Sequence, residues 1–173
     1  MQSKLRLLLS ATLIMVMVLG AEAQKDKKKR PSPPAQVTQT VDGKTITIDY
    51  SQPGVKGRKV LDGLIPYGKV WRTGANEATW IEISDDVMIE GEKLEKGKYS
   101  IFTIAGESEW TIIFNKTWDQ WGHYKYDEGM DALRIKVTPE MTSEFVERFT
   151  IDISEEGEVS LAWDKVVAKF DID

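Results

Sequence analysis

The sequence predicts an all-β protein, an antiparallel β-sandwich or a barrel-like variant of it, with two long end loops. Three observations predict this fold. Hydrophobic and polar residues alternate with a period of two along most of the chain, as in strands that bury one face. Turn-forming pairs such as Asp42-Gly43 and Lys96-Gly97 separate these runs. The sequence has no convincing helical stripe longer than three turns.

The first half of the domain is predicted to form short strands joined by tight turns. The first two flank Asp42-Gly43, the preferred two-residue hairpin turn, and Ile46, Ile48 and Tyr50 share one face of the second. Residues 110–115 are apolar on both faces, which is expected of a central strand. The predicted strands are residues 37–41, 44–50, 79–84, 87–90, 98–105 and 110–115.

The same alternation continues to the end of the chain. Glu156-Gly157 is predicted to form a turn between two apolar runs. Residues 141–148 fit either a strand or a helical turn. The apolar residues expected to alternate onto a buried face are Leu133, Ile135, Val137, Phe145, Phe149, Ile151, Ile153, Val159, Leu161, Trp163, Val166, Ala168, Phe170 and Ile172.

The first 23 residues have the features of a secretory signal peptide. Lys4 and Arg6 supply a positive start, residues 7–19 are almost wholly apolar, and residues 21–23 match a small-x-small cleavage site. The apolar run is short for a membrane span, which needs about 20 residues, although an uncleaved N-terminal anchor is the alternative. We therefore expect an exported protein, periplasmic or extracellular, whose mature chain begins at Gln24 and lacks a membrane span.

The mature chain is expected to consist of a basic, Pro-rich flexible linker over residues 24–35 and one sandwich domain over residues 36–173. From Pro31 onward, 16 Lys or Arg face 26 Asp or Glu. This acidic body argues against a nucleic-acid partner. The basic tail from Lys25 to Arg30 is suited to weak contact with anionic envelope components, although most charge runs are simply solvated.

Cysteine is absent from the sequence, which excludes disulfides, thiolate metal sites and cysteine nucleophiles. Because His123 is the single histidine, a zinc site would need carboxylates to complete it. The acidic residues between 119 and 131 do not have the spacing of an EF-hand calcium loop. We expect neither a metal nor a cofactor.

Two long segments interrupt the alternation and are the candidate sites. Residues 52–76 contain five glycines and two prolines, and residues 116–131 contain two tryptophans, His123 and two tyrosines. Loops this long are uncommon in compact domains unless they are functional or disordered, and aromatic residues argue against disorder. We expect the two loops to pack together at one end of the sandwich.

Five runs of residues carry a family resemblance. They are residues 50–58 (Y-S-Q-P-G-V-K-G-R), 64–79 (L-I-P-Y-G-K-V-W-R-T-G-A-N-E-A-T), 97–104 (G-K-Y-S-I-F-T-I), 109–116 (E-W-T-I-I-F-N-K) and 120–127 (Q-W-G-H-Y-K-Y-D). Through them the chain resembles the domain of unknown function 2911 family of exported bacterial proteins, over nearly all of its mature length. One departure is Ser51-Gln52-Pro53, where the family often reads S-R-P. The resemblance implies export and a β-rich domain, and it implies no activity.

The candidate ligand-binding residues lie in or beside the two loops: Arg58, Trp71, Arg72, Asn76, Trp118, Trp121 and Tyr124. Arg72 beside an indole suits a carboxylate, sulfate or phosphate, because a guanidinium binds such groups bidentately. Flat aromatic surfaces suit sugar rings. The structural alternative is that Arg72 anchors loop carbonyls and that the aromatic side chains cover one end of the sandwich.

These residues favour a non-catalytic binding module for a small polar, anionic or saccharide-like ligand. One alternative is a hydrolase that acts on an envelope component through Arg72, Glu77 and His123, and another is a purely structural envelope protein. Glu77 and His123 are the weak catalytic candidates, because a histidine base would need an orienting carboxylate and a nucleophile, for which Asp127 and Ser51 are nearest.

Overall fold

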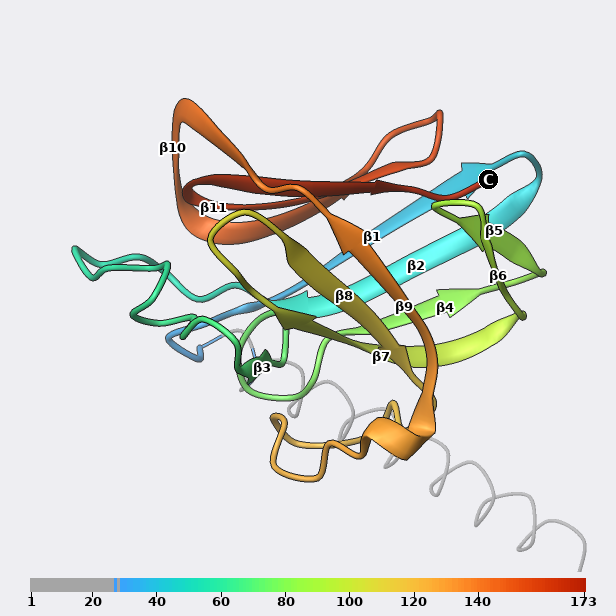
Figure 1. Cartoon of the computed structure of the whole chain (residues 1–173), viewed down its shortest axis with the longest axis horizontal. Coiled ribbons are helices and arrows are strands. Elements are labelled where there is room, and N and C mark those ends of the chain that lie inside the picture. Colours follow the sequence, from blue (N-terminus) through green and yellow to red (C-terminus); the bar gives the residue numbers. More distant parts are fainter. Residues whose placement is uncertain (1–26, 28) are drawn as a thin grey trace, which may run out of the picture.

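The computed structural model describes residue 27 and residues 29–173, and the regular secondary structure of this part of the chain is almost entirely antiparallel β-strand (Figure 1). The predicted signal peptide, residues 1–23, lies outside the described residues. In the described part, no helix has the length and apolar character that a membrane crossing requires.

One large sheet forms the first layer, in the order β1-β2-β4-β7-β8-β9, and the short β3 pairs with β7 beside this path. Every pairing in it is antiparallel. The strands are β1 (Pro34–Val41), β2 (Lys44–Ser51), β3 (Val70–Trp71), β4 (Trp80–Ile83), β7 (Gly97–Ile104), β8 (Trp110–Asn115) and β9 (Asp131–Val137).

A long hairpin of β10 (Glu140–Ile153) and β11 (Glu158–Asp171) forms the second layer across one face of the large sheet (Figure 1). Side chains from both layers interdigitate, as where the rings of Phe114 and Phe170 meet edge to face at 5.8 Å. A small hairpin of β5 (Val87–Ile89) and β6 (Glu92–Leu94) joins the end of β11 through an Ile89–Ile172 bridge. The predicted sandwich is therefore confirmed, and the large sheet does not close into a barrel.

The tyrosine of β2 ties the two layers together. The Tyr50 hydroxyl accepts a hydrogen bond from the Ile151 amide at 3.0 Å and lies 3.3 Å from the Ile151 carbonyl oxygen, to which it donates. Burial raises the pKa of Tyr50 above its ordinary value, so the hydroxyl keeps its proton in this position. The contact joins residues far apart in sequence and positions the hairpin over the sheet.

Irregularities in the long hairpin change which residues face the core. Val159, Leu161 and Trp163 are buried at odd positions, whereas Val166, Ala168 and Phe170 are buried at even positions. Asp164, with φ of 56°, lies where the alternation changes phase, and it is paired with Val146 between two register shifts of β10. Phe145, expected on the core face, is instead 52% exposed, and residues 141–148 form strand and no helical turn.

The second predicted loop covers the outer face of the large sheet. Tyr126 packs edge to face on Phe102 of β7, with ring centroids 5.0 Å apart. Its hydroxyl donates to Asp131 at 2.7 Å, and Arg134 donates to the same carboxylate oxygen at 2.7 Å. Burial and the Asp131 carboxylate raise the pKa of Tyr126 to about 12. This network and the short η1 turn (Glu128–Met130), which lies between Tyr126 and Asp131, anchor the loop where the chain enters β9.

The last residues of the Pro-rich segment are hydrogen-bonded to the domain. β1 begins at Pro34, two residues before the expected start of the domain at residue 36. The carbonyl oxygens of Pro31, Ser32 and Pro33 accept hydrogen bonds from Arg148, Asn76 and Gln52. Prolines lack an N–H donor, but their extended backbone leaves the carbonyl groups free to accept, which explains the attachment.

Candidate functional site

Residues 73–76, at the end of the first loop, form a tight turn. Thr73 and Asn76 have φ of 52° and 61°, and Gly74 between them has φ of 154°. A Cβ atom on Gly74 would lie 3.0 Å from the Ser51 carbonyl oxygen, so the turn packs directly against the end of β2. The side chain of Asn76 donates to Ser32 and Ser51, and it thereby holds the N-terminal segment. Asn76 thus has a structural role here and lines neither of the two cavities described below.

Trp71 and Arg72 are placed by β3 and by the layer beneath it. The Trp71 indole donates to the Gly74 carbonyl at 3.1 Å, stacks on Trp163 with centroids 5.9 Å apart, and meets Phe149 edge to face at 5.1 Å. These contacts and the pairing of β3 with β7 fix the direction of the chain at Arg72. Arg58 reaches the same region from earlier in the loop, where it donates to the Gly54 carbonyl at 2.7 Å.

The two predicted loops contact each other through their backbones. The Gly122 amide donates to the Asn76 carbonyl at 3.1 Å, and the Ala78 amide donates to the Gln120 carbonyl at 3.0 Å. Gly122 is so close to the first loop that a Cβ there would be 3.6 Å from Arg72 Nη1. This contact brings His123 into the same region as Arg72.

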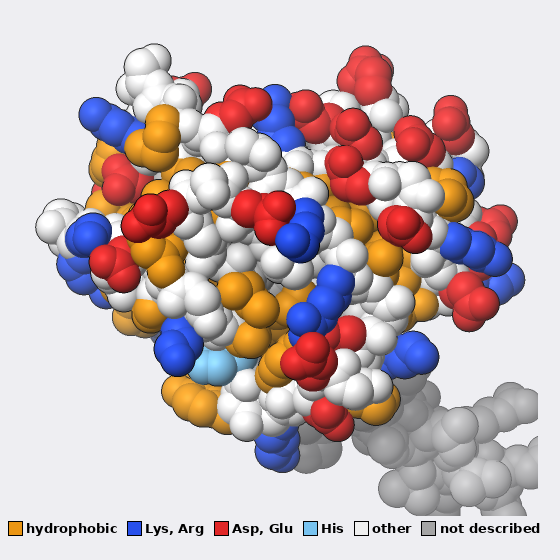
Figure 2. Space-filling view, viewed as in Figure 1, with side chains coloured by type: hydrophobic (Ala, Val, Ile, Leu, Met, Phe, Trp, Pro, Cys, Tyr) orange, Lys and Arg blue, Asp and Glu red, His pale blue; other side chains and the backbone are white. Residues whose placement is uncertain are grey.

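A cavity of about 530 Å³ lies between these elements, and we call it the cationic cavity. Its volume is in the range of small-molecule sites. Arg58, Lys69, Arg72 and His123 line it, and none of its lining residues within the described chain is acidic. Trp71 and Trp163 contribute aromatic surface. In Figure 2 the histidine colour appears low on the face, next to basic and apolar side chains, and acidic side chains are most numerous in the upper half of the view.

Three lining residues of the cationic cavity have buried nitrogen atoms without a hydrogen-bond partner among the described residues: Arg72 Nε, His123 Nδ1 and Trp163 Nε1. Buried donors are nearly always paired, so three unpaired nitrogens at one cavity require an explanation. Burial, and next the charge of Arg72, hold the pKa of His123 below its ordinary value of 6.5. His123 is therefore neutral at pH 7, and its ring stacks on Tyr124 at 5.1 Å.

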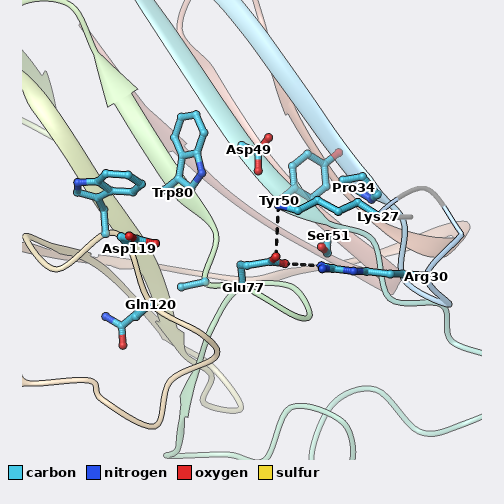
Figure 3. A pocket seen from close by; sticks show the side chains of 12 residues that line it. Lys27, Arg30, Pro34, Asp49, Tyr50, Ser51, Glu77, Trp80, Asp119 and Gln120 are labelled. Atoms are coloured by element: carbon cyan, nitrogen blue, oxygen red, sulfur yellow. Dashed lines mark hydrogen bonds and ion pairs between the residues drawn. The ribbon is translucent and has the colours of Figure 1, made fainter. Parts of the chain in front are cut away.

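A second, smaller cavity of about 180 Å³ lies on the outer face of the large sheet (Figure 3), and we call it the Glu77 groove. Asp49 of β2, Trp80 of β4 and Asp119 and Gln120 of the second loop line it with Glu77. Lys27 and Arg30 enter from the N-terminal segment and form ion pairs with Glu77. Trp118 completes the lining beside Trp80, and the two rings meet edge to face at 6.5 Å.

The structure divides the predicted site residues between these cavities. Arg58, Trp71, Arg72 and His123 line the cationic cavity, whereas Glu77 and Trp118 line the Glu77 groove. Trp121 and Tyr124 line neither and are 57% and 77% exposed.

Sequence reasoning missed Trp163, Asp49 and Gln120 as lining residues. The alternation of β11 marks Trp163 only as a core residue, and Asp49 has the appearance of an ordinary polar-face residue of a strand. Across residue 27 and residues 29–173, no cluster of three or more His, Asp or Glu side chains is placed to hold a metal ion.

The sequence profile of the family described as "Protein of unknown function (DUF2911)" matches residues 32–172. The chain belongs to this family. No curated protein and no solved structure matches the chain. The DUF2911 match includes every strand and both site-forming loops, and every lining residue of the cationic cavity falls within it. Lys27 and Arg30, which enter the Glu77 groove, precede the DUF2911 match.

Proposed function

We propose that this protein is an exported, non-catalytic binding protein that holds a small anionic ligand in the cationic cavity. The observation that carries the proposal is the lining of this cavity, which contains Arg58, Lys69, Arg72 and His123 and no carboxylate among the described residues. Export rests on the predicted signal peptide of residues 1–23.

The basic lining favours a ligand that accepts hydrogen bonds. The guanidinium groups of Arg58 and Arg72 can only donate hydrogen bonds. A carboxylate, sulfate or phosphate would form charge-assisted hydrogen bonds with them. The low dielectric of a partly enclosed cavity strengthens such contacts relative to those in water.

The arrangement supports binding more than hydrolysis. The hydrolase alternative needs Arg72, Glu77 and His123 at one place, but Glu77 lines the other cavity and is engaged by Lys27 and Arg30. Trp71 and Trp163 instead offer aromatic surface to the apolar part of a ligand, which is typical of binding sites for organic acids and acidic sugars.

Thermal melting with a panel of ligands tests the proposal. We expect sulfate, phosphate, small carboxylic acids or glucuronate to raise the melting temperature of the wild type, while neutral glucose does not. Arg72→Gln is expected to weaken binding at least about tenfold, since it removes a charge-assisted contact worth about 1.5–3 kcal/mol. Lys136→Gln, which removes an exposed positive charge on β9 outside the cavity lining, is the matched control and should bind as the wild type does. Absence of any anion-dependent shift in the wild type, together with unfolding of Arg72→Gln, would show that Arg72 is only a structural anchor.

Anion binding is also expected to depend on pH through His123. The pKa of His123 in the free protein lies below 6.5, and a bound anion favours the protonated ring and raises that pKa. Affinity for sulfate should therefore increase as the pH falls through 6.5 toward the lowered pKa, by about tenfold for each unit by which the anion raises it. Isothermal titration at several pH values should detect proton uptake, and His123→Gln should abolish both effects. Affinity that is independent of pH in the wild type would exclude His123 from the site.

A further inference from the structure

The Glu77 groove has a lining that accepts hydrogen bonds and attracts positive charge. Asp49, Glu77 and Asp119 supply three carboxylates. Gln120 also lines the groove, where its amide nitrogen donates to the Thr117 carbonyl at 2.7 Å, but its amide group points away from Glu77 (Figure 3). The three carboxylates favour a ligand that carries N–H groups and positive charge.

The chain already places such groups in the groove. Arg30 Nη1 donates to Glu77 Oε2 at 2.7 Å, and Lys27 Nζ lies 3.3 Å from Glu77 Oε1, so two side chains three residues apart engage the two oxygens of one carboxylate (Figure 3). The Arg30 guanidinium also lies 5.8 Å from the centre of the Trp121 ring. This is the pattern in which a basic peptide segment is recognised by a carboxylate and an aromatic face.

The aromatic wall of the groove also has affinity for cations. The ammonium group of Lys98 lies 3.4 Å from the centre of the Trp80 ring and 4.1 Å from that of Trp118. Because Lys98 comes from β7 of the sheet itself, it holds Trp118, and with it the second loop, in place at one side of the groove. The acceptors that remain for an incoming segment are the carboxylates of Asp49, Glu77 and Asp119.

The ion pairs of the N-terminal segment are exposed enough to exchange. The side chains of Lys27, Arg30 and Glu77 are 49%, 30% and 40% exposed, and ion pairs of this kind contribute little to stability. Burial raises the pKa of Glu77, but its own backbone hydrogen bond and the two basic side chains outweigh this effect and lower the pKa overall. Glu77 is therefore ionised at neutral pH while the segment is in place.

We propose that the Glu77 groove is a binding site for lysine and arginine side chains of an extended peptide segment, and that Lys27 and Arg30 occupy it as an internal competitor. A peptide is the fitting ligand because the occupant in the structure is a peptide segment with two cationic side chains. Attachment to the same chain gives this segment a high effective concentration, so a peptide added from outside binds weakly until the segment is removed or neutralised. The inference does not depend on the proposed anion binding.

Fluorescence anisotropy with a labelled peptide of the sequence of residues 24–33 tests the site. The purified chain is compared with a Lys27→Ser and Arg30→Ser double variant, which keeps its length but lacks the internal competitor. We expect the double variant to bind the peptide at least about tenfold more tightly than the wild type, since the competitor acts at an effective concentration that reaches millimolar for short tethers. Adding Glu77→Gln to the double variant should reverse this gain while circular dichroism shows an unchanged fold.

The matched control is Glu109→Gln in the double-variant background, which removes an exposed carboxylate from the β7–β8 turn, outside the groove lining. It should leave peptide binding unchanged. Equal binding by the wild type and the double variant would overturn the proposal, as would equal losses from Glu77→Gln and Glu109→Gln, which would indicate general charge attraction. Equal binding of a control peptide in which serine replaces every lysine and arginine would also overturn it.

Discussion

Replacing Trp71 with alanine is expected to lower the free energy of unfolding by about 3–5 kcal/mol, the usual cost of truncating a buried tryptophan. Trp71 is 8% exposed, stacks on Trp163 and meets Phe149 edge to face. Its loss would also leave the Gly74 carbonyl without its indole donor. Urea unfolding followed by circular dichroism measures the change.

The control for this substitution is Trp121→Ala, since Trp121 is 57% exposed on the second loop. Surface substitutions of this kind usually change stability by no more than about 0.5 kcal/mol. Because Trp71 also walls the cationic cavity, Trp71→Ala should weaken anion binding, whereas Trp121→Ala should not. A Trp71→Ala variant as stable as Trp121→Ala would contradict the assigned packing between β3 and the β10–β11 hairpin.

Gly157→Ala is expected to lower the free energy of unfolding by about 2–5 kcal/mol, because it combines backbone strain with a steric clash. Gly157 has φ of 96°, a region that favours glycine, and a Cβ atom there would lie 2.1 Å from the Ile172 carbonyl oxygen. The Ile172 amide also donates to the Gly157 carbonyl at 3.0 Å. Moving the turn away from Ile172 would therefore break this hydrogen bond at the end of β11.

Gly43→Ala separates the two contributions to this loss. Gly43 has φ of 79° in the turn between β1 and β2, and no atom would lie within 4 Å of a Cβ there. Its substitution should therefore carry only the backbone cost of about 1–2 kcal/mol. Thermal and urea unfolding of both variants should show a clearly larger loss for Gly157→Ala, and equal losses would refute the close approach of Gly157 to Ile172.

The strands could be predicted from the sequence because the direction of a strand side chain is a local property. Residues 110–115 coincide with β8, and Asp42-Gly43 forms the turn between the first two strands. Prediction from local alternation fails after Trp163. The buried positions of β11 change phase after it, and only pairing with the irregular β10 makes the two apolar runs one continuous strand.

The family membership was also determined by the sequence, because the runs around Trp71 and Trp121 are local patterns that the profile of residues 32–172 matches. The candidate loops were determined in the same way, since residues 52–76 and 116–131 are the segments that interrupt the alternation. Only the tertiary structure decided which of their residues lie together. Arg72 and His123 share one cavity while Glu77, five residues from Arg72, lines another. The physical reason is that both cavities depend on contacts between distant segments, such as the Asn76–Gly122 hydrogen bond and the packing of Trp71 on Trp163, and alternation along the chain carries no information about such pairs.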